Sequence, residues 1–504
     1  LRDVYKRQVL RVLQFGEGAF LRGFADWMID VANGAGVLNA RVSVVETRQR
    51  GTGEILRHQD GLYTVLLRGL KEGIPFSSRR IVSCIEQVFN PGPDWFDLLA
   101  LAADPALRVV LSDTSENGIA DVDEPWRKRQ SPQSFPAQVT ALLFARYQAL
   151  GGGRETGLLF LPCEAIEANG ANLCRIVLKH AQDWGLSEAF IAWVAECNHF
   201  CKTLVDCIVP NLPATEAEVL KVDSGYTDPL LTVAEPFHQW VIEGPSTLAE
   251  IFPLHKAGLD VVWTLDLQPY RARKLRLFNG LHTVGASVAL GTGVRMISGM
   301  LGDASISAFL QRVAFEEILP SIPLPEDMCR RYVCALMERM ANPYVHHELA
   351  AIMPNSISKW QLRVLPALKS HVATRAQIPA GLSFSLAALL DYYCGGFNEQ
   401  GVFIGRGHGG NYPVRDTPDV LAILAEAWRS QEDAFDSLAQ RVQGLLVDPR
   451  LWGEDLNLIP GLTEQVSTSL AHIQAGGMKA ALATLLESKG YKRALTVRTL
   501  PMEV

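Results

Sequence analysis

Several features that would mark a membrane, nucleic-acid-binding or secreted protein are missing from this sequence. Its 504 residues contain no run of eighteen apolar residues, so we expect no membrane-spanning helix and no membrane partner. The formal net charge of −7 leaves no excess of positive charge for the phosphates of a nucleic acid. Residues 1–8 are polar and basic without an apolar stretch, so no secretory signal is expected there.

Cysteine is sparse, and its nine copies form neither a metal-binding pattern nor a disulfide framework. They are odd in number and lie mostly within apolar segments, which is typical of reduced thiols in a cytoplasmic protein. The tightest group, in residues 197–207, contains no C-x-x-C pair and no separate second pair of ligands. Residues 346–348 read HHE and do not match the H-E-x-x-H pattern of zinc proteases. We therefore expect no metal.

Apolar residues are abundant, at 48% of the chain, and a chain of this length can form two substantial cores. In the first half, short β-rich runs alternate with helical stretches, and this alternation predicts a parallel sheet. The runs are residues 9–15, 41–45, 109–112 and 157–162.

Long helical patterns dominate the chain from about residue 270 onward. They cover residues 305–318, 328–340, 383–393, 418–429 and 463–486. The expected fold class is α/β, with a Rossmann-type parallel-sheet domain over residues 9–268 and a mostly α-helical domain over residues 269–495.

The first β-rich run leads into a glycine-rich turn, in which residues 16–23 read GEGAFLRG. Gly16 permits a tight strand-to-helix turn, and Gly18 allows backbone N–H groups to approach a pyrophosphate at the positive end of the following helix. Leu21 occupies the position of the third glycine of G-x-G-x-x-G, so an ordinary strand–turn–helix is the alternative.

The second β-rich run ends at Glu46, where a carboxylate can bind the two ribose hydroxyls of a dinucleotide. A carboxylate would also repel a 2′-phosphate, which favours NAD over NADP, although Arg48 and Arg50 weaken that preference. The third run ends in a polar turn that contains Thr114 and Glu116, at the edge where open α/β sheets bind ligands. A plain Asx turn is the alternative there.

Three side chains of catalytic type, Lys274, Asn279 and His282, lie close together in a segment with a helical pattern. At about 100° per residue they fall on one side of an α-helix. The other side carries an apolar stripe that would dock the helix onto a core, made of Leu277, Leu281, Val284 and Val288. The alternative is a solvated polar face with a chance histidine.

Tyr270 and Lys274 also match the Y-x-x-x-K pair of short-chain dehydrogenases, in which the tyrosine donates the proton. Those enzymes are smaller single domains with the pair inside the Rossmann fold. Tyr270 instead follows Pro269 near the expected domain junction, which favours the lysine as proton donor.

In combination, these motifs resemble the mannitol dehydrogenase family of long-chain, metal-independent polyol dehydrogenases. The resemblance also rests on LPCE at residues 161–164, Asn169-Gly170 and TLVD at residues 203–206, and it spans nearly the whole chain after residue 8. It implies a Rossmann-type amino-terminal domain, a helical carboxyl-terminal domain and reduction of a ketone by NADH without a metal.

The resemblance further implies roles for individual residues. Lys274 would be the general acid, with a pKa lowered by burial to roughly 7 to 8. Asn279 and Asn169 would stabilise the developing alkoxide, and His282 would position a substrate hydroxyl. Asp206 would lie near the substrate, although the next residue is cysteine where the family usually has arginine. The implied nucleotide-binding residues are Gly16, Gly18, Phe20, Arg22, Glu46, Thr114 and Glu116.

A substrate with a carboxylate requires a cation, and Asn355, Lys359 and Arg363 recur at i, i+4 and i+8 of a predicted helix. Arg363 could bind a carboxylate through two parallel hydrogen bonds, and an exposed basic stripe is the alternative. The resemblance implies a small-molecule keto-uronate that is reduced to an aldonate, and Arg363 would bind its carboxylate. A nucleotide-binding protein that has lost catalysis and senses NADH is the other class of function, but a sensor has no need of Lys274.

Overall fold

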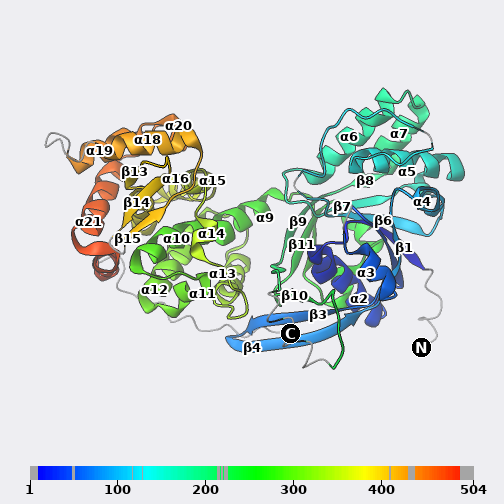
Figure 1. Cartoon of the computed structure of the whole chain (residues 1–504), viewed down its shortest axis with the longest axis horizontal. Coiled ribbons are helices and arrows are strands. Elements are labelled where there is room, and N and C mark those ends of the chain that lie inside the picture. Colours follow the sequence, from blue (N-terminus) through cyan, green and yellow to red (C-terminus); the bar gives the residue numbers. More distant parts are fainter. Residues whose placement is uncertain are drawn as a thin grey trace. The chain divides into compact units, whose positions relative to one another are not determined.

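The computed structural model describes residues 9–47, 51–115, 117–127, 129–212, 216, 220, 225–407, 410–429 and 437–488. These residues divide into two compact units (Figure 1). One contains the chain up to Gly69 together with Pro75–Gln268, and the other contains Leu70–Ile74 and the chain from Pro269 onward. Among the helices in these ranges, none has both the length and the apolar composition needed to cross a lipid bilayer.

A six-stranded parallel sheet forms the centre of the first unit, with the strand order β5-β2-β1-β6-β7-β8. The strands are β1 (Leu10–Phe15), β2 (Ala40–Val45), β5 (Ile85–Phe89), β6 (Leu107–Ser112), β7 (Leu159–Pro162) and β8 (His199–Phe200). The predicted parallel α/β architecture is confirmed. The order reverses between β1 and β6, and the carboxyl ends of strands at such a switch point are where open α/β sheets bind ligands.

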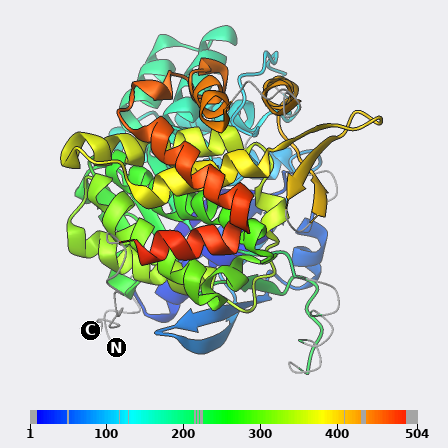
Figure 2. The ribbon, with the colours of Figure 1, turned by 90° about the vertical axis from the view of Figure 1, so that its left-hand side faces the viewer.

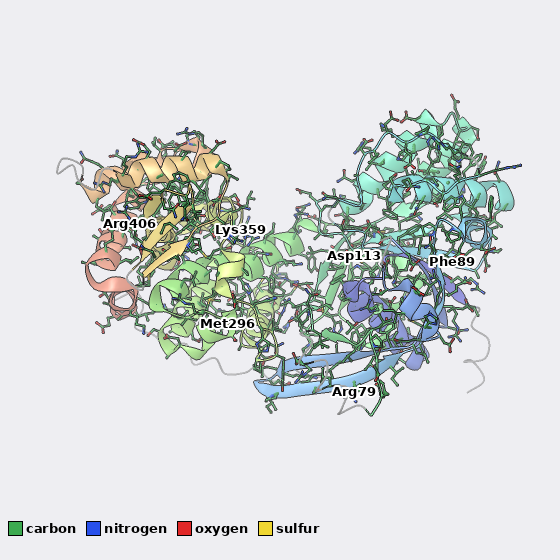
Figure 3. All side chains as sticks on the ribbon, in the orientation of Figure 1. Arg79, Phe89, Asp113, Met296, Lys359 and Arg406 are labelled. Atoms are coloured by element: carbon green, nitrogen blue, oxygen red, sulfur yellow. The ribbon has the colours of Figure 1, made fainter. Side chains whose placement is uncertain are left out.

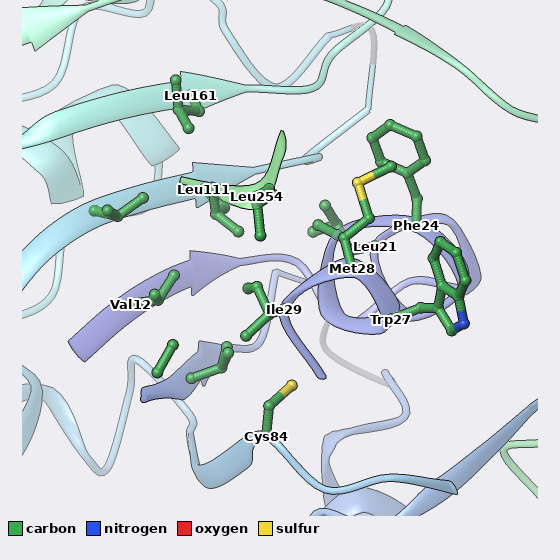
Figure 4. Packing of buried hydrophobic residues seen from close by; sticks show 14 of the residues in the cluster. Val12, Leu21, Phe24, Trp27, Met28, Ile29, Cys84, Leu111, Leu161 and Leu254 are labelled. Carbon is green, nitrogen blue, oxygen red and sulfur yellow. The ribbon is translucent and has the colours of Figure 1, made fainter. Parts of the chain in front are cut away.

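Two hydrophobic cores cover the two faces of this sheet, because successive side chains of a strand point to opposite sides. On one face, Val12, Leu111 and Leu161 pack with Phe24 and Met28 of the helix that follows the glycine turn (Figure 4). The other face shares its core with α4 (Trp95–Ala102), α5 (Phe135–Leu150), α6 (Asn169–Asp183) and α7 (Glu188–Cys197).

Two three-stranded sheets extend the first unit. One has the order β10-β3-β4, with β3 (Tyr63–Lys71), β4 (Ile74–Val82) and β10 (Thr232–Ala234). The other has the order β12-β11-β9, with β9 (Lys202–Asp206), β11 (Gln239–Glu243) and β12 (Val261–Thr264). Neither of these two sheets is predicted from the sequence pattern.

The second unit is mostly helical, as the sequence predicts. Its helices include α9 (Gln268–Arg273), η6 (Lys274–Asn279), α10 (Gly280–Thr292), α11 (Ile297–Gly302), α12 (Ala304–Arg312), η7 (Val313–Ile318), α13 (Glu326–Met340), α14 (Leu349–Ile352), α15 (Ser356–Arg363), α16 (Leu365–Arg375), α17 (Ala380–Tyr392), α18 (Pro418–Arg429), α19 (Leu438–Leu446), α20 (Pro449–Trp452) and α21 (Leu462–Glu487).

Helix α10 lies at the centre of this unit and contacts α12, α15, α17 and α21. The predicted apolar stripe from Leu277 to Val288 is fully buried. Small residues allow the close packing, since a Cβ atom on Gly285 would come within 3.0 Å of Leu310 and Met300. Helix α21 bends at Gly477, where φ is 78° (Figure 2).

A small antiparallel sheet in the second unit was not predicted. It consists of β13 (Gly395–Phe397), β14 (Phe403–Gly407) and β15 (Gly410–Pro413). Glycine has a low strand propensity, so its frequency here hides the strand pattern. The structure requires glycine for close approach, because a Cβ on Gly405 would lie 2.4 Å from the ring of Tyr412.

Candidate functional site

The glycine turn lies at the switch point of the parallel sheet. Gly16 has φ of +118°, and a Cβ at this position would lie 2.7 Å from the carbonyl oxygen of Asp113, at the end of β6 (Figure 3). Gly18 is the N-cap of α1 (Ala19–Leu21) and no atom lies within 4 Å of where its Cβ would be. Open space therefore borders the start of the helix, and helix N-termini of this kind can bind phosphate.

Arg22 and Phe20 support this turn from within the unit. Arg22 is buried, and its guanidinium donates hydrogen bonds to the carbonyl oxygen of Glu17 at 2.6 Å and to Thr232 Oγ1 at 3.2 Å. Burial lowers the pKa of Arg22. The Phe20 ring stacks on Phe24 with 5.1 Å between the ring centroids. In this structure both side chains have internal partners that hold the turn in shape.

Glu46 ends the second strand as predicted, but it has a partner that the sequence did not reveal. Arg57 Nη2 donates to Glu46 Oε2 at 3.1 Å, and Glu46 is buried. A Cβ on Gly53 would lie 1.9 Å from Glu46 Oε1, so this glycine makes room for the carboxylate. Arg48, Arg50 and Glu116, to which the sequence assigned roles at the nucleotide site, lie outside the described residues.

Thr114 binds a carboxylate that was not among the predicted site residues. Its N–H and its hydroxyl donate to Glu164 Oε1 at 3.0 and 2.8 Å, and Ser112 Oγ donates to Glu164 Oε2 at 2.9 Å. Burial raises the pKa of Glu164 even though these donors favour its charged form. Glu164 thus joins the ends of β6 and β7. The sequence signal that could have identified it is a carboxylate two residues after the end of a buried strand.

Asn169 and Asp206 are both buried in the first unit, near the ends of β7 and β9. The Asn169 amide group donates to the carbonyl oxygens of Pro162 and Glu164 at 3.0 and 3.1 Å. Its carbonyl accepts from the N–H groups of Gly170 and Thr203 at 2.9 and 3.0 Å. The backbone therefore uses the hydrogen-bonding capacity of Asn169. To donate directly to a substrate oxygen, Asn169 would have to release one of these partners.

Asp26 forms a buried acid beneath the glycine turn, at the end of the π-helical segment η2 (Arg22–Asp26). Its side chain is fully buried and accepts hydrogen bonds from Gln14 Nε2 at 3.3 Å and from the Tyr63 hydroxyl at 3.1 Å. Burial raises the pKa of Asp26 to about 7, and the two hydrogen bonds oppose this rise. The folded protein therefore retains a proton on Asp26 at pH values where an exposed carboxyl has lost it.

This retained proton makes stability depend on pH. Between pH about 4 and 7 the folded state binds the Asp26 proton more tightly than the unfolded state, so stability decreases as the pH rises through that window. Asp26→Asn removes the effect, and at pH 8 we expect the variant to be more stable by up to about 4 kcal/mol, at about 1.4 kcal/mol per pKa unit. Midpoints of urea-induced unfolding at pH 5 and pH 8 measure this. An equal shift at both pH values would contradict it.

Lys274 and Asn279 are the first and last residues of the π-helix η6. The α-helical spacing assumed for them is wrong here, because π-helical hydrogen bonds join residues i and i+5. The wider turn places Asn279 one turn above Lys274, whereas an α-helix would separate them by about 140° around the axis. His282 follows Asn279 by three residues in the regular helix α10 and so shares its face.

His282 is held in one tautomer. Its Nδ1 lies 2.6 Å from the carbonyl oxygen of Phe278, and a carbonyl can only accept, so Nδ1 carries the proton. Burial, together with the nearby charges of Arg339 and Arg363, lowers the pKa of His282 to about 4. The Arg339 guanidinium lies 4.4 Å from the centroid of the Phe278 ring. At neutral pH the imidazole is therefore neutral, and Nε2 can accept a hydrogen bond.

Lys359, which is labelled in Figure 3, and Arg363 lie on α15, and this helix packs against α10. Lys359 Nζ donates to the carbonyl oxygen of Ile352 at 2.9 Å, and Arg363 Nη1 donates to Thr283 Oγ1 at 3.3 Å. Both cations are half-buried, which disfavours the alternative of an exposed basic stripe. Asn355 differs, since it is exposed and precedes the helix in a left-handed conformation with φ of 58°.

The two cations lie close enough to influence each other. The pKa of Lys359 is lowered by burial and by the charge of Arg363, and burial also lowers the pKa of Arg363. In the described part of the chain, neither side chain forms a salt bridge with a carboxylate. The charge of Asp416 opposes the lowering of the Lys359 pKa, but Asp416 forms no salt bridge with Lys359. Two half-buried cations without a salt bridge favour the binding of an anion.

The described residues contain no group of three or more His, Cys, Asp or Glu side chains placed to hold a metal ion. None of the nine cysteines, all of which lie in the described ranges, forms a disulfide bond.

Two solved structures share the fold. A D-sorbitol dehydrogenase in substrate-free form superposes with a TM-score of 0.75 at 20% identity, covering 94% of this chain and 97% of that one. A Pseudomonas fluorescens mannitol 2-dehydrogenase in ternary complex with NAD and D-mannitol has a TM-score of 0.64 at 20% identity, covering 96% of each chain.

Sequence comparison is more specific than the fold. The altronate oxidoreductase of Halalkalibacterium halodurans is 38% identical over 482 residues, which cover 95% of this chain and 94% of that protein. The altronate oxidoreductase of Bacillus subtilis is 38% identical over 481 residues, which cover 95% and 96%. Residues 10–256 match the mannitol dehydrogenase Rossmann domain and residues 266–474 the mannitol dehydrogenase C-terminal domain, so the chain belongs to the mannitol dehydrogenase family.

Proposed function

We propose that this protein is an NAD-dependent tagaturonate reductase, which reduces the ketone of tagaturonate to the alcohol of altronate. Relatives of nearly full length at 38% identity carry the name altronate oxidoreductase, and this supports the choice of a sugar acid. The structural observation that carries the proposal is the pair of half-buried cations, Lys359 and Arg363, next to the helix that bears His282.

The substrate carboxylate is the proposed ligand of these cations. Arg363 presents a planar guanidinium that can form two parallel hydrogen bonds with a carboxylate, and Lys359 adds a second positive charge nearby. A neutral sugar would leave both cations without a salt bridge in a partly dehydrated environment, which is unfavourable. The substrate class that fits is therefore a keto-uronate.

The residues of the glycine turn fit a dinucleotide. Gly16 permits the tight turn and Gly18 leaves space at the start of the helix for a pyrophosphate, and Glu46 at the end of β2 would bind the adenosine ribose. The Glu46 carboxylate favours NAD because it repels a 2′-phosphate, and it also neutralises Arg57. When bound, the coenzyme supplies the hydride that reduces the ketone.

Three residues of η6 and α10 handle the proton and the substrate oxygens in this proposal. Lys274 protonates the alkoxide formed during reduction and removes the proton in the reverse direction. The Asn279 amide donates a hydrogen bond to the oxygen that gains negative charge. His282 Nε2 accepts from a substrate hydroxyl, a role that its neutral state at pH 7 permits. Asn169, whose donors are taken by the backbone, positions the turn after β7.

Steady-state oxidation of NADH by the purified protein tests this function. We would compare tagaturonate, fructuronate and fructose by kcat/KM, with a chelator present, and repeat the best substrate with NADPH. The proposal predicts a preference for tagaturonate and for NADH. Preference for fructuronate would indicate the sibling fructuronate reductase, and preference for fructose would remove the carboxylate role of Arg363. Tight NADH binding without any turnover would favour the sensor.

A further inference from the structure

Thr283 connects the proposed carboxylate-binding residue to the proposed catalytic turn. It lies in the first turn of α10 and is buried. Its hydroxyl donates to the carbonyl oxygen of Asn279 at 2.9 Å and accepts from Arg363 Nη1 at 3.3 Å. A hydroxyl has one donor and two acceptor positions, so it can make both bonds at once. The donated bond fixes the hydroxyl hydrogen and leaves its lone pairs for the guanidinium.

Helix packing holds Arg363 close to Thr283. A Cβ on Gly280 would lie only 3.4 Å from the carbonyl oxygen of Arg363, so the end of α15 lies against the start of α10. The side chain of Arg363 is half-buried in this contact. Its guanidinium is thus confined near the first turn of α10, and the hydroxyl of Thr283 sets its orientation.

A hydroxyl group is well suited to orienting the guanidinium of Arg363. The bond to Thr283 uses one of the five N–H groups of the guanidinium, and it leaves the Nε and Nη2 edge available for two parallel bonds with a carboxylate. A carboxylate at position 283 would orient Arg363 as well, but it would neutralise the charge that attracts the substrate. A long flexible side chain that is already oriented also loses less freedom when the ligand binds.

We infer that Thr283 is a positioning residue for substrate specificity, which holds Arg363 in the orientation that binds the carboxylate of a keto-uronate. This rests on the proposed function, in which Arg363 binds that carboxylate. The hydrogen bond to Asn279 ties the same threonine to the turn that bears Lys274. Thr283 therefore links the carboxylate-binding group to the catalytic turn through two hydrogen bonds.

A double-mutant cycle tests this inference, with kcat/KM for tagaturonate measured in Thr283→Val, Arg363→Ala and the double variant. Valine has nearly the shape of threonine but lacks the hydroxyl. We expect Thr283→Val to lower kcat/KM about tenfold, mainly through KM, as loss of one hydrogen bond to a charged group predicts. In the Arg363→Ala background the same change should have no further effect. Thr283→Ser keeps the hydroxyl and should restore most of the loss.

Thr292→Val is the matched control, because Thr292 is also on α10 but its hydroxyl donates only to its own helix, at Ala289. This variant should behave as the parent protein does. An equal loss from Thr283→Val with and without Arg363 would show that Thr283 acts independently of the guanidinium and would overturn the inference. If Arg363→Ala itself retained the kcat/KM of the parent protein, the proposed carboxylate site would fail instead.

Discussion

Replacement of Lys274 by methionine is expected to reduce kcat for tagaturonate by about a thousandfold and to leave NADH binding unchanged. Methionine keeps the length of the side chain but cannot donate a proton, and a positioned general acid contributes about 10² to 10⁴ in rate. The glycine turn and Glu46 lie in the other unit, so NADH affinity should persist. NADH fluorescence measures the binding, and steady-state kinetics measures kcat.

Two further variants test whether the loss of kcat is specific to Lys274. Lys369→Met removes an exposed lysine of the same unit that pairs with Glu454, and it should retain activity because surface salt bridges contribute little. Tyr270→Phe addresses the alternative proton donor. If Tyr270→Phe abolished turnover and Lys274→Met retained it, the tyrosine would be the acid.

The pH profile of kcat/KM adds a further check on Lys274. The pKa of His282 is lowered to about 4, so this residue stays neutral from pH 6 to 9 and contributes no titration there. The parent protein should show a single ionisation in this range. If that ionisation is absent from the profile of Lys274→Met, Lys274 is the titrating group.

Arg363→Ala is expected to raise KM for tagaturonate about a hundredfold while the kinetics with fructose change little. Hydrogen bonds to charged groups are worth about 1.5–3 kcal/mol, and the loss of a two-bond contact therefore costs at least about 3 kcal/mol. Fructose has no carboxylate and does not use this contact. The ratio of kcat/KM for the two substrates is the measurement.

Arg375→Ala is the matched control, because Arg375 is an exposed arginine at the end of α16. It should leave the ratio unchanged. If Arg363→Ala lowered kcat/KM equally for both substrates, Arg363 would support the structure of α15 rather than bind a carboxylate.

The parts of the fold that were predicted from sequence are those whose signal lies within one segment. Alternating and continuous apolar runs located β1, β2, β6 and β7 to within two residues, because burial on a sheet dictates residue type locally. The π-helix η6 could not be predicted in this way. It differs from an α-helix by one residue in a turn, and its composition is that of any helix.

The candidate site was only partly predictable for a related reason. Sequence patterns indicated Glu46 and Thr114 as polar residues at the ends of strands, and the structure places them there. Their partners, Arg57 and Glu164, lie 11 and 50 residues away in the chain, and no spacing rule links them. The amide of Asn169 is bound by backbone groups of β7 and β9, two strands of different sheets that only the folded unit brings together.

The sequence by itself determined the parallel sheet, the glycine turn and the segment that carries Lys274, Asn279 and His282, because periodicity and glycine content are properties of adjacent residues. Only the tertiary structure decided that Arg363 meets Thr283, 80 residues earlier in the chain, and that both cations of α15 are half-buried without a salt bridge among the described residues. Such contacts depend on how helices pack against one another, and side-chain packing across that distance is not encoded in any local pattern.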